Sequence, residues 1–240
     1  MNVDRLHLHL HLYSQEHLGR VVRLLSPVIE RSASVLVTIP ASVVDELRGE
    51  VNRVLPAAHV LEAEAALLDW SGYLRAFSEV EASPLLVFCN DSVVTRRHTT
   101  RWSIRRFLTR CDEAPSRSLI GELDVSSESV CLDGRSSTAW ISSYLFGTKG
   151  WLPDPARLVL ELDAEVERQL AEESSLFMAH LRAHRPSYLS DPQALHSKVA
   201  TMVLERRMTE LASQDCVTIT NAFGGSMVRK FERLAESLVA

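Results

Sequence analysis

Short segments with the period of a strand alternate with segments of helical spacing along the first ninety residues of the chain. Leucine alternates with histidine over residues 6–12, which is the two-residue period of a strand. Continuous apolar runs at 35–39 and 85–89 are typical of buried strands, and residues 58–61 predict a weaker one. Three segments of helical spacing separate these strands: residues 16–31, 42–54 (with Ser42 as the N-cap) and 65–77. This order predicts a parallel sheet with helices on both faces.

The second half of the chain has a more helical pattern. A helix, a short strand and another helix follow the fourth predicted strand, over residues 99–110, 118–121 and 137–146. From residue 155 onward helical spacing dominates, apart from a loop at 186–192 and a strand at 216–220. Because no stretch rich in Gly, Ser or Pro divides the sequence, we expect one α/β domain over residues 1–240.

The composition disfavours several classes of protein. The 240 residues carry 26 Lys and Arg against 31 Asp and Glu, and this net charge of -5 argues against a nucleic-acid-binding protein. Four widely spaced cysteines without a Cys-x-x-Cys pair argue against a zinc knuckle and a disulfide scaffold. No signal sequence opens the chain, and no apolar run reaches the roughly 20 residues of a membrane helix. We therefore expect a cytoplasmic protein, or one held peripherally at the inner membrane by partners.

Polar residues follow the most apolar predicted strand directly. Asn90, Asp91 and Ser92 come after residues 85–89, and ligands of open parallel sheets bind beyond the carboxyl ends of the strands. A carboxylate in this position can hold a divalent ion that neutralises a diphosphate group. The same three residues equally suit a cap of the next element, and the sequence does not decide between the two roles.

A second candidate segment is Asp69-Trp70-Ser71-Gly72-Tyr73, which lies in the helix predicted after the third strand. Glycine inside a helix costs about 1 kcal/mol, so Gly72 indicates a close approach of backbone or ligand. Asp69 could hydrogen-bond a ribose or a base. The alternative is an ordinary carboxylate at a helix N-terminus, with Trp70 and Tyr73 in the core.

Two further patterns concern phosphate groups. The basic pairs Arg96-Arg97 and Arg105-Arg106 fit either a solvated helix face or phosphate binding. Residues 221–226, which include two glycines, follow a predicted strand and suit either a turn or a second contact to a diphosphate.

The histidine-rich strand gives a rival hypothesis. His7, His9 and His11 share one face of the strand, and imidazoles in this arrangement can hold a zinc ion that activates water for hydrolysis. The ends of the later predicted strands add no histidine that would complete such a site. The alternative is a semi-polar strand face on which His9 or His11 lines a cleft.

Seven short motifs follow one another along the chain. They are Leu-His-Leu-His-Leu-Tyr at 8–13, Val-Leu-Val-Thr at 35–38, Asp-Trp-Ser-Gly-Tyr-Leu at 69–74, Leu-Val-Phe-Cys-Asn-Asp-Ser at 86–92, Ser-Leu-Ile-Gly at 118–121, Trp-Ile-Ser-Ser-Tyr-Leu-Phe at 140–146, and residues 198–211 with Glu-Arg-Arg at 205–207. In this order they resemble the rhamnan-synthesis F-type proteins, which are glycosyltransferase-like proteins of bacterial polysaccharide assembly. The resemblance implies a GT-A-like, Rossmann-type fold: a mainly parallel sheet flanked by helices, with a nucleotide-binding part at 1–125 and a helix-rich acceptor-side part at 126–240.

The resemblance also implies a function. It suggests a glycosyltransferase of hexosyltransferase type that moves a sugar from a nucleotide-sugar donor to a saccharide or lipid-linked saccharide acceptor, in the synthesis of a bacterial surface polysaccharide such as lipopolysaccharide. A divalent metal ion, Mn or Mg, would be held by Asp91. The donor-binding residues would be His9, His11, Asp69, Asn90, Asp91 and Ser92, and the acceptor-side residues Trp140, Ser142, Ser143 and Tyr144.

Two departures from the family pattern leave another function open. Residues 64–68 read Glu-Ala-Ala-Leu-Leu, and the acidic motif is Asn-Asp in place of Asp-x-Asp. Either departure could mean an altered choice of donor, independence of metal or lost activity. The Asn-Asp motif favours a non-catalytic binding or scaffold module in a polysaccharide-assembly complex, with the amphipathic segment 225–239 as a surface for a partner protein. No general base stands out, and the carboxylates in reach are Glu122, Asp124 and Asp133.

Overall fold

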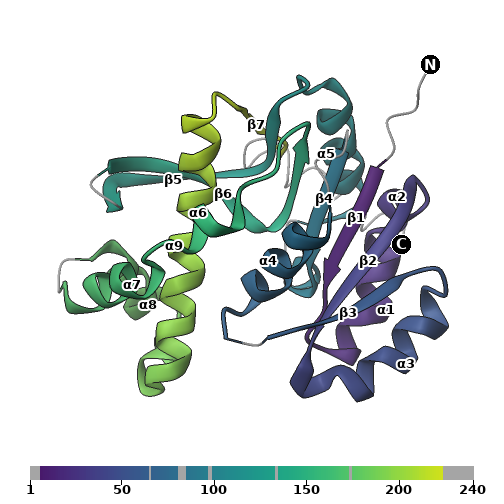
Figure 1. The fold of residues 1–240 in the computed structure, drawn as a ribbon, viewed down its shortest axis with the longest axis horizontal. Helices are drawn as coiled ribbons and strands as arrows, with labels where there is room; N and C mark the ends of the chain where they lie inside the picture. The colour runs from purple at the N-terminus through teal and green to yellow at the C-terminus, as the bar shows by residue number, and fades with distance from the viewer. Residues whose placement is uncertain are drawn as a thin grey trace.

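A computed structural model describes residues 6–64, 66–80, 85–96, 99–132, 135–172 and 175–223 of the chain (Figure 1). Its described strands form one seven-stranded sheet in the order β3-β2-β1-β4-β6-β5-β7. The strands are β1 (Leu6–His11), β2 (Ser32–Pro40), β3 (His59–Ala63), β4 (Leu85–Asn90), β5 (Ser118–Leu132), β6 (Arg135–Lys149) and β7 (Thr218–Asn221).

Strand direction divides the sheet at one place. β1 pairs in parallel with β2 and β4, and β2 pairs in parallel with β3. β6 runs antiparallel to both of its neighbours, β4 and β5, whereas β5 and β7 are parallel. The result is the GT-A-like, mainly parallel Rossmann-type sheet expected from the sequence. The carboxyl ends of β1 to β4 therefore meet at one edge, beside the middle of β6.

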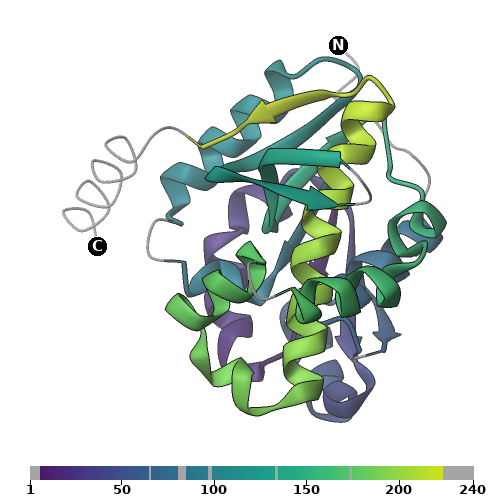
Figure 2. The same cartoon turned by 90° about the vertical axis from the view of Figure 1, so that its left-hand side faces the viewer.

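Helices cover both faces of this sheet. They are α1 (Gln15–Leu24), α2 (Ser26–Ile29), α3 (Val44–Val54), α4 (Asp69–Glu79), α5 (Arg101–Glu113), α6 (Pro155–Val159), α7 (Leu162–Ala171), α8 (Leu176–His184) and α9 (Pro192–Gln214), with short 3-10 turns η1 (Ala41–Val43), η2 (Asp91–Val94) and η3 (Pro186–Ser190). In Figure 2, α9 runs almost the full height of the molecule and ends beside β7, the strand that follows it. The C-terminal half is therefore rich in helix, as expected.

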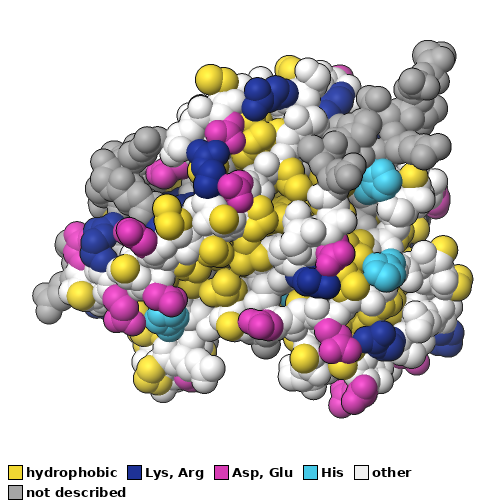
Figure 3. Space-filling view, in the orientation of Figure 1, with side chains coloured by type: hydrophobic (Ala, Val, Ile, Leu, Met, Phe, Trp, Pro, Cys, Tyr) yellow, Lys and Arg dark blue, Asp and Glu magenta, His cyan; other side chains and the backbone are white. Residues whose placement is uncertain are grey.

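Alternation along β4 separates two apolar clusters. Val87 and Cys89 pack with the leucines of β1 and with helices α1, α3 and α5, whereas Leu86 and Phe88 pack with α4 and α6 to α9. Figure 3 shows hydrophobic side chains gathered in the centre of the face seen in Figure 1. Among the described residues, no helix is both long and apolar enough to cross a membrane.

The structure departs most from prediction at residues 137–146, which were expected to form a helix and belong to strand β6. Both faces of this stretch are buried from Ile141 to Thr148, so it shows no two-residue alternation. Its aromatic residues and β-branched Ile141 suit a strand. The short strand predicted at 118–121 likewise extends to Leu132 as β5, which pairs along β6.

Element boundaries account for the smaller corrections. Ser42 is not a cap, because η1 intervenes and α3 begins at Val44 without a side-chain cap. The helix predicted over 16–31 is divided into α1 and α2, and the second helix begins at Ser26 with Pro27 in its first turn. The helix predicted over 65–77 begins only at Asp69. The amphipathic segment 225–239 and part of 221–226 lie outside the described residues.

Candidate functional site

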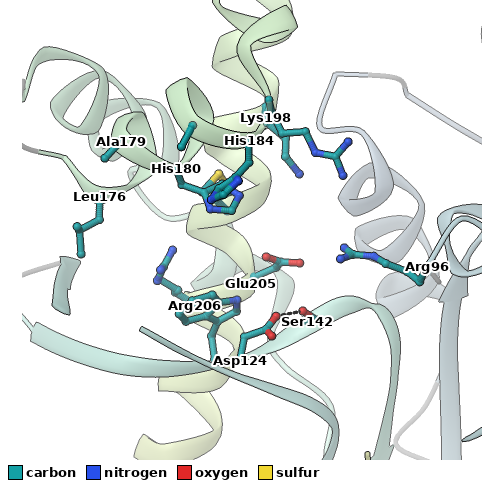
Figure 4. A pocket seen from close by; sticks show the side chains of 14 residues that line it. Arg96, Asp124, Ser142, Leu176, Ala179, His180, His184, Lys198, Glu205 and Arg206 are labelled. Carbon is teal, nitrogen blue, oxygen red and sulfur yellow. Dashed lines mark hydrogen bonds between the residues drawn. The ribbon is translucent and has the colours of Figure 1, made fainter. Parts of the chain in front are cut away.

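A cavity of about 550 Å³ lies between strands β5 and β6 and helices α8 and α9, with Arg96, which follows the carboxyl end of β4, in its wall. Its walls come from segments that are far apart in the sequence, as Figure 4 shows. Arg96 follows η2, Asp124 and Ser142 lie on the neighbouring strands β5 and β6, and α9 supplies a stripe of polar residues. The charged residues in its wall are Arg96, Asp124, Arg185, Lys198, Glu205 and Arg206.

Positive charge exceeds negative charge in this wall. Arg96, Arg185, Lys198 and Arg206 face only two carboxylates, those of Asp124 and Glu205. Within the part of the chain that the structure describes, none of the four cations forms an ion pair within 4.0 Å. Lys198 and Arg206 are eight residues apart on α9, so a little over two turns brings them to the same face. The cavity is therefore suited to an anion.

Arg206 is the most enclosed of these cations. The side chain is only 5% exposed, and its guanidinium carbon lies 4.0 Å from the ring centroid of Trp140 and 4.4 Å from that of Phe177. Its Nε has no hydrogen-bond partner among the described residues. Burial lowers the pKa of Arg206 to about 10, against the opposing effect of Glu205 and Asp124.

Glu205 has a structural contact with β6. Its Oε1 accepts hydrogen bonds from the backbone N–H of Ser143 (2.9 Å) and from the Ser143 hydroxyl (2.7 Å). One turn along α9, Thr209 accepts a hydrogen bond from the backbone N–H of Ile141. These two residues of α9 thus satisfy backbone donors of β6 beyond the point where β6 pairs with β4.

Asp124 is the second carboxylate of the wall. Its Oδ2 accepts a short hydrogen bond from the Ser142 hydroxyl (dashed in Figure 4). Burial raises the pKa of Asp124, an effect that the Ser142 hydrogen bond opposes and that the neighbouring carboxylates Glu122 and Glu205 reinforce.

The four predicted acceptor-side residues all lie on β6, and the structure brings two of them into the cavity wall. Trp140 and Ser142 line the cavity. The Ser143 hydroxyl is bonded to Glu205, and the Tyr144 hydroxyl donates to Glu122 while the guanidinium of Arg96 lies 4.8 Å from the Tyr144 ring centroid. Ser143 and Tyr144 therefore contribute to the site by fixing neighbouring side chains and do not themselves line the cavity.

The residues after β4 have capping contacts. Asn90 Oδ1 accepts hydrogen bonds from both the backbone N–H and the hydroxyl of Ser92, which caps η2. Asp91 is 5% exposed, and its Oδ2 accepts from the backbone N–H groups of Tyr13 (2.9 Å) and Ser14 (3.0 Å). His17 Nδ1 lies 3.6 Å from the same oxygen. Asp91 thus joins the end of β4 to the loop between β1 and α1.

Asp69 begins α4 at the same edge of the sheet, after Leu68 with its positive φ of 49°. Burial raises the pKa of Asp69 to about 7; Lys198 and Arg96 lower it, and Asp91 and Glu205 raise it. Asp69 does not line the cavity, although two of its electrostatic neighbours, Lys198 and Arg96, do. The predicted interior positions of Trp70 and Tyr73 are confirmed, since both are 0% exposed.

His9 and His11 lie beneath this edge and are buried. His9 Nε2 and His11 Nδ1 both hydrogen-bond the hydroxyl of Thr38, at 2.8 and 2.7 Å. Burial holds the pKa of His11 at about 4 and that of His9 well below its usual value, so both imidazoles are neutral. A Cβ on Gly72 would lie 2.1 Å from His11 Nδ1. The close approach predicted at Gly72 is therefore one between its backbone and the His11 side chain.

The described residues contain no group of three His, Cys, Asp or Glu side chains that could hold a metal ion. The third residue of the histidine face, His7, hydrogen-bonds Ser34. The geometry therefore gives the histidine-strand hydrolase hypothesis no support.

The residues of the cavity wall between Leu176 and Arg206 were not predicted as part of the site. Arg185, Lys198, Glu205 and Arg206 were missed, as was His180 in the same wall. A spacing signal was present, because Glu205 and Arg206 lie seven and eight residues after Lys198, which brings the three side chains to one side of a helix.

Comparisons with known proteins give folds and no family. No family model matches the chain, and no curated protein matches it. Among solved structures, it is similar to the 4-diphosphocytidyl-2C-methyl-D-erythritol synthase of Anaerococcus prevotii, with 6% identity, a TM-score of 0.48, and 98% of this chain and 97% of that chain covered. It is also similar to a CMP:2-keto-3-deoxy-manno-octonic acid synthetase complexed with CTP, with 10% identity, a TM-score of 0.43, and 98% of this chain and 99% of that chain covered. A third similar structure is the inositol-1-phosphate CTP transferase of T. maritima, with 10% identity, a TM-score of 0.39 and 96% of each chain covered. At such identities and scores the function must come from the residues of the cavity themselves.

Proposed function

We propose that this chain is a glycosyltransferase that takes its sugar from a nucleotide-sugar donor and binds the donor's diphosphate in the cavity. One observation carries the proposal: beside strands β5 and β6 of a GT-A-like sheet, four cations without ion pairs among the described residues share a cavity with two carboxylates. The diphosphate group of a nucleotide sugar is dianionic and would balance this excess charge. A volume of about 550 Å³ is within the range of small-molecule sites.

The charges also suit the chemistry of transfer. When the glycosidic bond to the diphosphate breaks, negative charge grows on the leaving phosphate. Fixed cations at that position stabilise the transition state more than the ground state. The nucleoside would lie toward β1 and α4, where Asp69 and the unpartnered Tyr13 hydroxyl lie at the same edge.

Asp124 is the group that we propose to accept the proton of the acceptor hydroxyl. It lies in the cavity wall, its pKa is raised by burial, and Ser142 fixes one of its two oxygens. The second oxygen is then left to receive a proton from a saccharide or lipid-linked saccharide acceptor. Glu205 is less suited to this role, because its Oε1 holds two hydrogen bonds from Ser143.

A divalent ion at Asp91 stays a prediction, and the geometry of Asp91 does not favour it. The carboxylate is 5% exposed, and its Oδ2 accepts two backbone hydrogen bonds that hold the β1–α1 loop. A magnesium or manganese ion would therefore have to compete with these amides for Asp91. The cationic wall supplies positive charge to a diphosphate independently of such an ion.

The test is thermal stabilisation by UDP, GDP, CDP and dTDP, each with and without Mn²⁺ or Mg²⁺, followed by hydrolysis and transfer assays with nucleotide sugars of the stabilising base. We expect one nucleotide to raise the melting temperature. Asp124→Asn should keep this binding and lose turnover. Asp91→Ala should lower the melting temperature without ligand, because it leaves the backbone N–H groups of Tyr13 and Ser14 unpaired, and it should change the nucleotide-induced shift only in its metal-dependent part. No stabilisation by any nucleotide would refute the proposal.

A non-catalytic binding module is the second candidate, and the backbone contacts of Asp91 favour it, since the residue of the Asn-Asp motif serves a loop. It predicts nucleotide binding without turnover, or binding to a polysaccharide-assembly partner alone. The same assays separate the two candidates. Only a transferase has a rate of sugar transfer that Asp124→Asn can lower.

A further inference from the structure

Arg206 and Arg207 are neighbours on α9 and are equally buried, at 5% and 4% exposure, but they differ in their partners. Arg207 Nη1 donates to the backbone carbonyls of Leu158 (3.0 Å) and Leu160 (2.7 Å), so the protein satisfies its guanidinium. Arg206 has no ion pair and no hydrogen bond among the described residues. A buried guanidinium without a partner is unfavourable unless a ligand completes it.

Two aromatic rings hold the Arg206 guanidinium in place. Its carbon lies over the rings of Trp140 and Phe177, at 4.0 and 4.4 Å from their centroids. Contacts of this kind use the faces of the planar group and leave its N–H donors pointing outward in the plane. The rings therefore fix a planar fork of donors, the geometry that binds the oxygens of phosphate groups in a bidentate manner.

The fork faces a cavity in which other cations converge. Figure 4 shows Arg96, Lys198 and Arg206 entering from different sides, with Glu205 and Asp124 between them. Lys198 is on the same face of α9 as Arg206, and the guanidinium of Arg96 lies over the Tyr144 ring on the far side. The surroundings thus offer one rigid donor fork and two further cations to the same ligand.

We propose that Arg206 is the anchor of a phosphate-binding subsite, in which its fork binds a phosphate or diphosphate group directly while Lys198 and Arg96 neutralise the remaining charge. The ligand class is a phosphorylated small molecule, and its identity as a nucleoside diphosphate rests on the proposed function. Trp140 and Phe177 are positioning residues that orient the fork.

The experiment measures binding of inorganic pyrophosphate and of the four nucleoside diphosphates to the whole chain by calorimetry. It compares wild type with Arg206→Met, Arg206→Lys and the matched control Arg207→Met. Loss of a hydrogen-bonded charge on the ligand should weaken pyrophosphate binding at least about 10-fold in Arg206→Met. Arg206→Lys, which keeps the charge without the fork, should fall between it and wild type. Arg207→Met should bind as wild type does while its melting temperature falls.

Two results would overturn the subsite. One is wild-type affinity for pyrophosphate in a folded Arg206→Met or Arg206→Lys protein, and the other is absence of pyrophosphate and nucleotide binding in wild type. If pyrophosphate binding depends on Arg206 but no nucleoside diphosphate binds more tightly than pyrophosphate, the subsite stands and the nucleotide-sugar function fails. If a nucleoside diphosphate binds equally well to wild type and Arg206→Met, the subsite fails and the function stands.

Discussion

Replacing Gly72 by alanine would place a methyl group inside the histidine cluster under the site. A Cβ at this position would lie 2.1 Å from His11 Nδ1 and 2.5 Å from Thr38 Oγ1. His11 is 0% exposed and its ring packs at 4.6 Å against Tyr13, so the ring has little room to move. The methyl group must therefore displace the imidazole and break its 2.7 Å hydrogen bond to Thr38.

The expected loss of folding free energy in Gly72→Ala combines two destabilising effects and one stabilising effect. Overpacking of a core costs about 1–3 kcal/mol. A buried hydrogen bond left unmade costs about 1–3 kcal/mol. Alanine returns about 1 kcal/mol in the interior of helix α4. The middle of these ranges gives a loss of about 3 kcal/mol, and in a domain of this size that lowers the melting temperature by roughly 6–12 °C.

Gly49→Ala is the matched control. Gly49 also lies inside a helix, α3, and a Cβ there would meet no atom within 4 Å. This variant should gain about 1 kcal/mol and melt roughly 2–4 °C higher than wild type. Thermal denaturation followed by circular dichroism measures both variants. Equal melting temperatures for Gly72→Ala and Gly49→Ala would refute the packing described around His11.

Three further predictions concern the charged groups of the site. Burial lowers the pKa of Arg206 to about 10, which corresponds to about 3 kcal/mol against the charged form, offset by about 0.5–2 kcal/mol for each cation–π contact. Arg206→Met without ligand should therefore melt no lower than wild type in differential scanning fluorimetry, whereas Arg207→Met should melt lower; equal losses would make Arg206 a structural residue. Burial raises the pKa of Asp69 to about 7, so the folded state binds a proton that the unfolded state releases, and wild-type stability should fall as pH rises from about 4 to about 7. Asp69→Asn should flatten this part of the curve of melting temperature against pH, and an unchanged slope would contradict the assignment. Burial, and then His184 and nearby cations, lower the pKa of His180, and a bound phosphate group should raise it. Relative to His180→Gln, wild type should thus gain affinity for pyrophosphate as the pH falls from neutral to about 5.5, and the same pH dependence of the two proteins in calorimetry would be the contrary result.

The first four strands could be predicted because each has a local pattern. The Leu-His alternation of β1 reports one apolar and one semi-polar face, and the short apolar run of β4 is bounded by polar residues on its carboxyl side. Strand β6 has no such pattern. Around Ser143 its backbone and hydroxyl are bonded by Glu205, a residue 62 positions away, so a polar run could be buried as a strand. A pattern within residues 137–146 cannot indicate a partner so distant in the sequence.

The sequence predicted which strand ends meet, but none of the six predicted donor-binding residues lines the cavity, and of the predicted acceptor-side residues only Trp140 and Ser142 do. The topology of parallel strands decides which strand ends meet, and Asp69 and Asp91 do lie at the predicted edge. What Asp91 does there depends on the conformation of the β1–α1 loop, whose two amides bind its carboxylate. No spacing in the sequence reports the orientation of those amides.

The two adjacent arginines of α9 show most clearly what a sequence pattern leaves undecided. Arg206 and Arg207 are adjacent, chemically identical and buried to the same extent, so sequence and burial alone would give them one role. Successive residues of a helix point in different directions. The Arg207 guanidinium therefore reaches carbonyls of the α6 segment, and the Arg206 guanidinium lies against two aromatic rings at a cavity. One charge is completed by the fold, and the other is left for a ligand to complete. For a residue of this kind, the absence of a partner within the described chain is the more informative observation, because a fold that only needed stability would gain by replacing it with an apolar side chain.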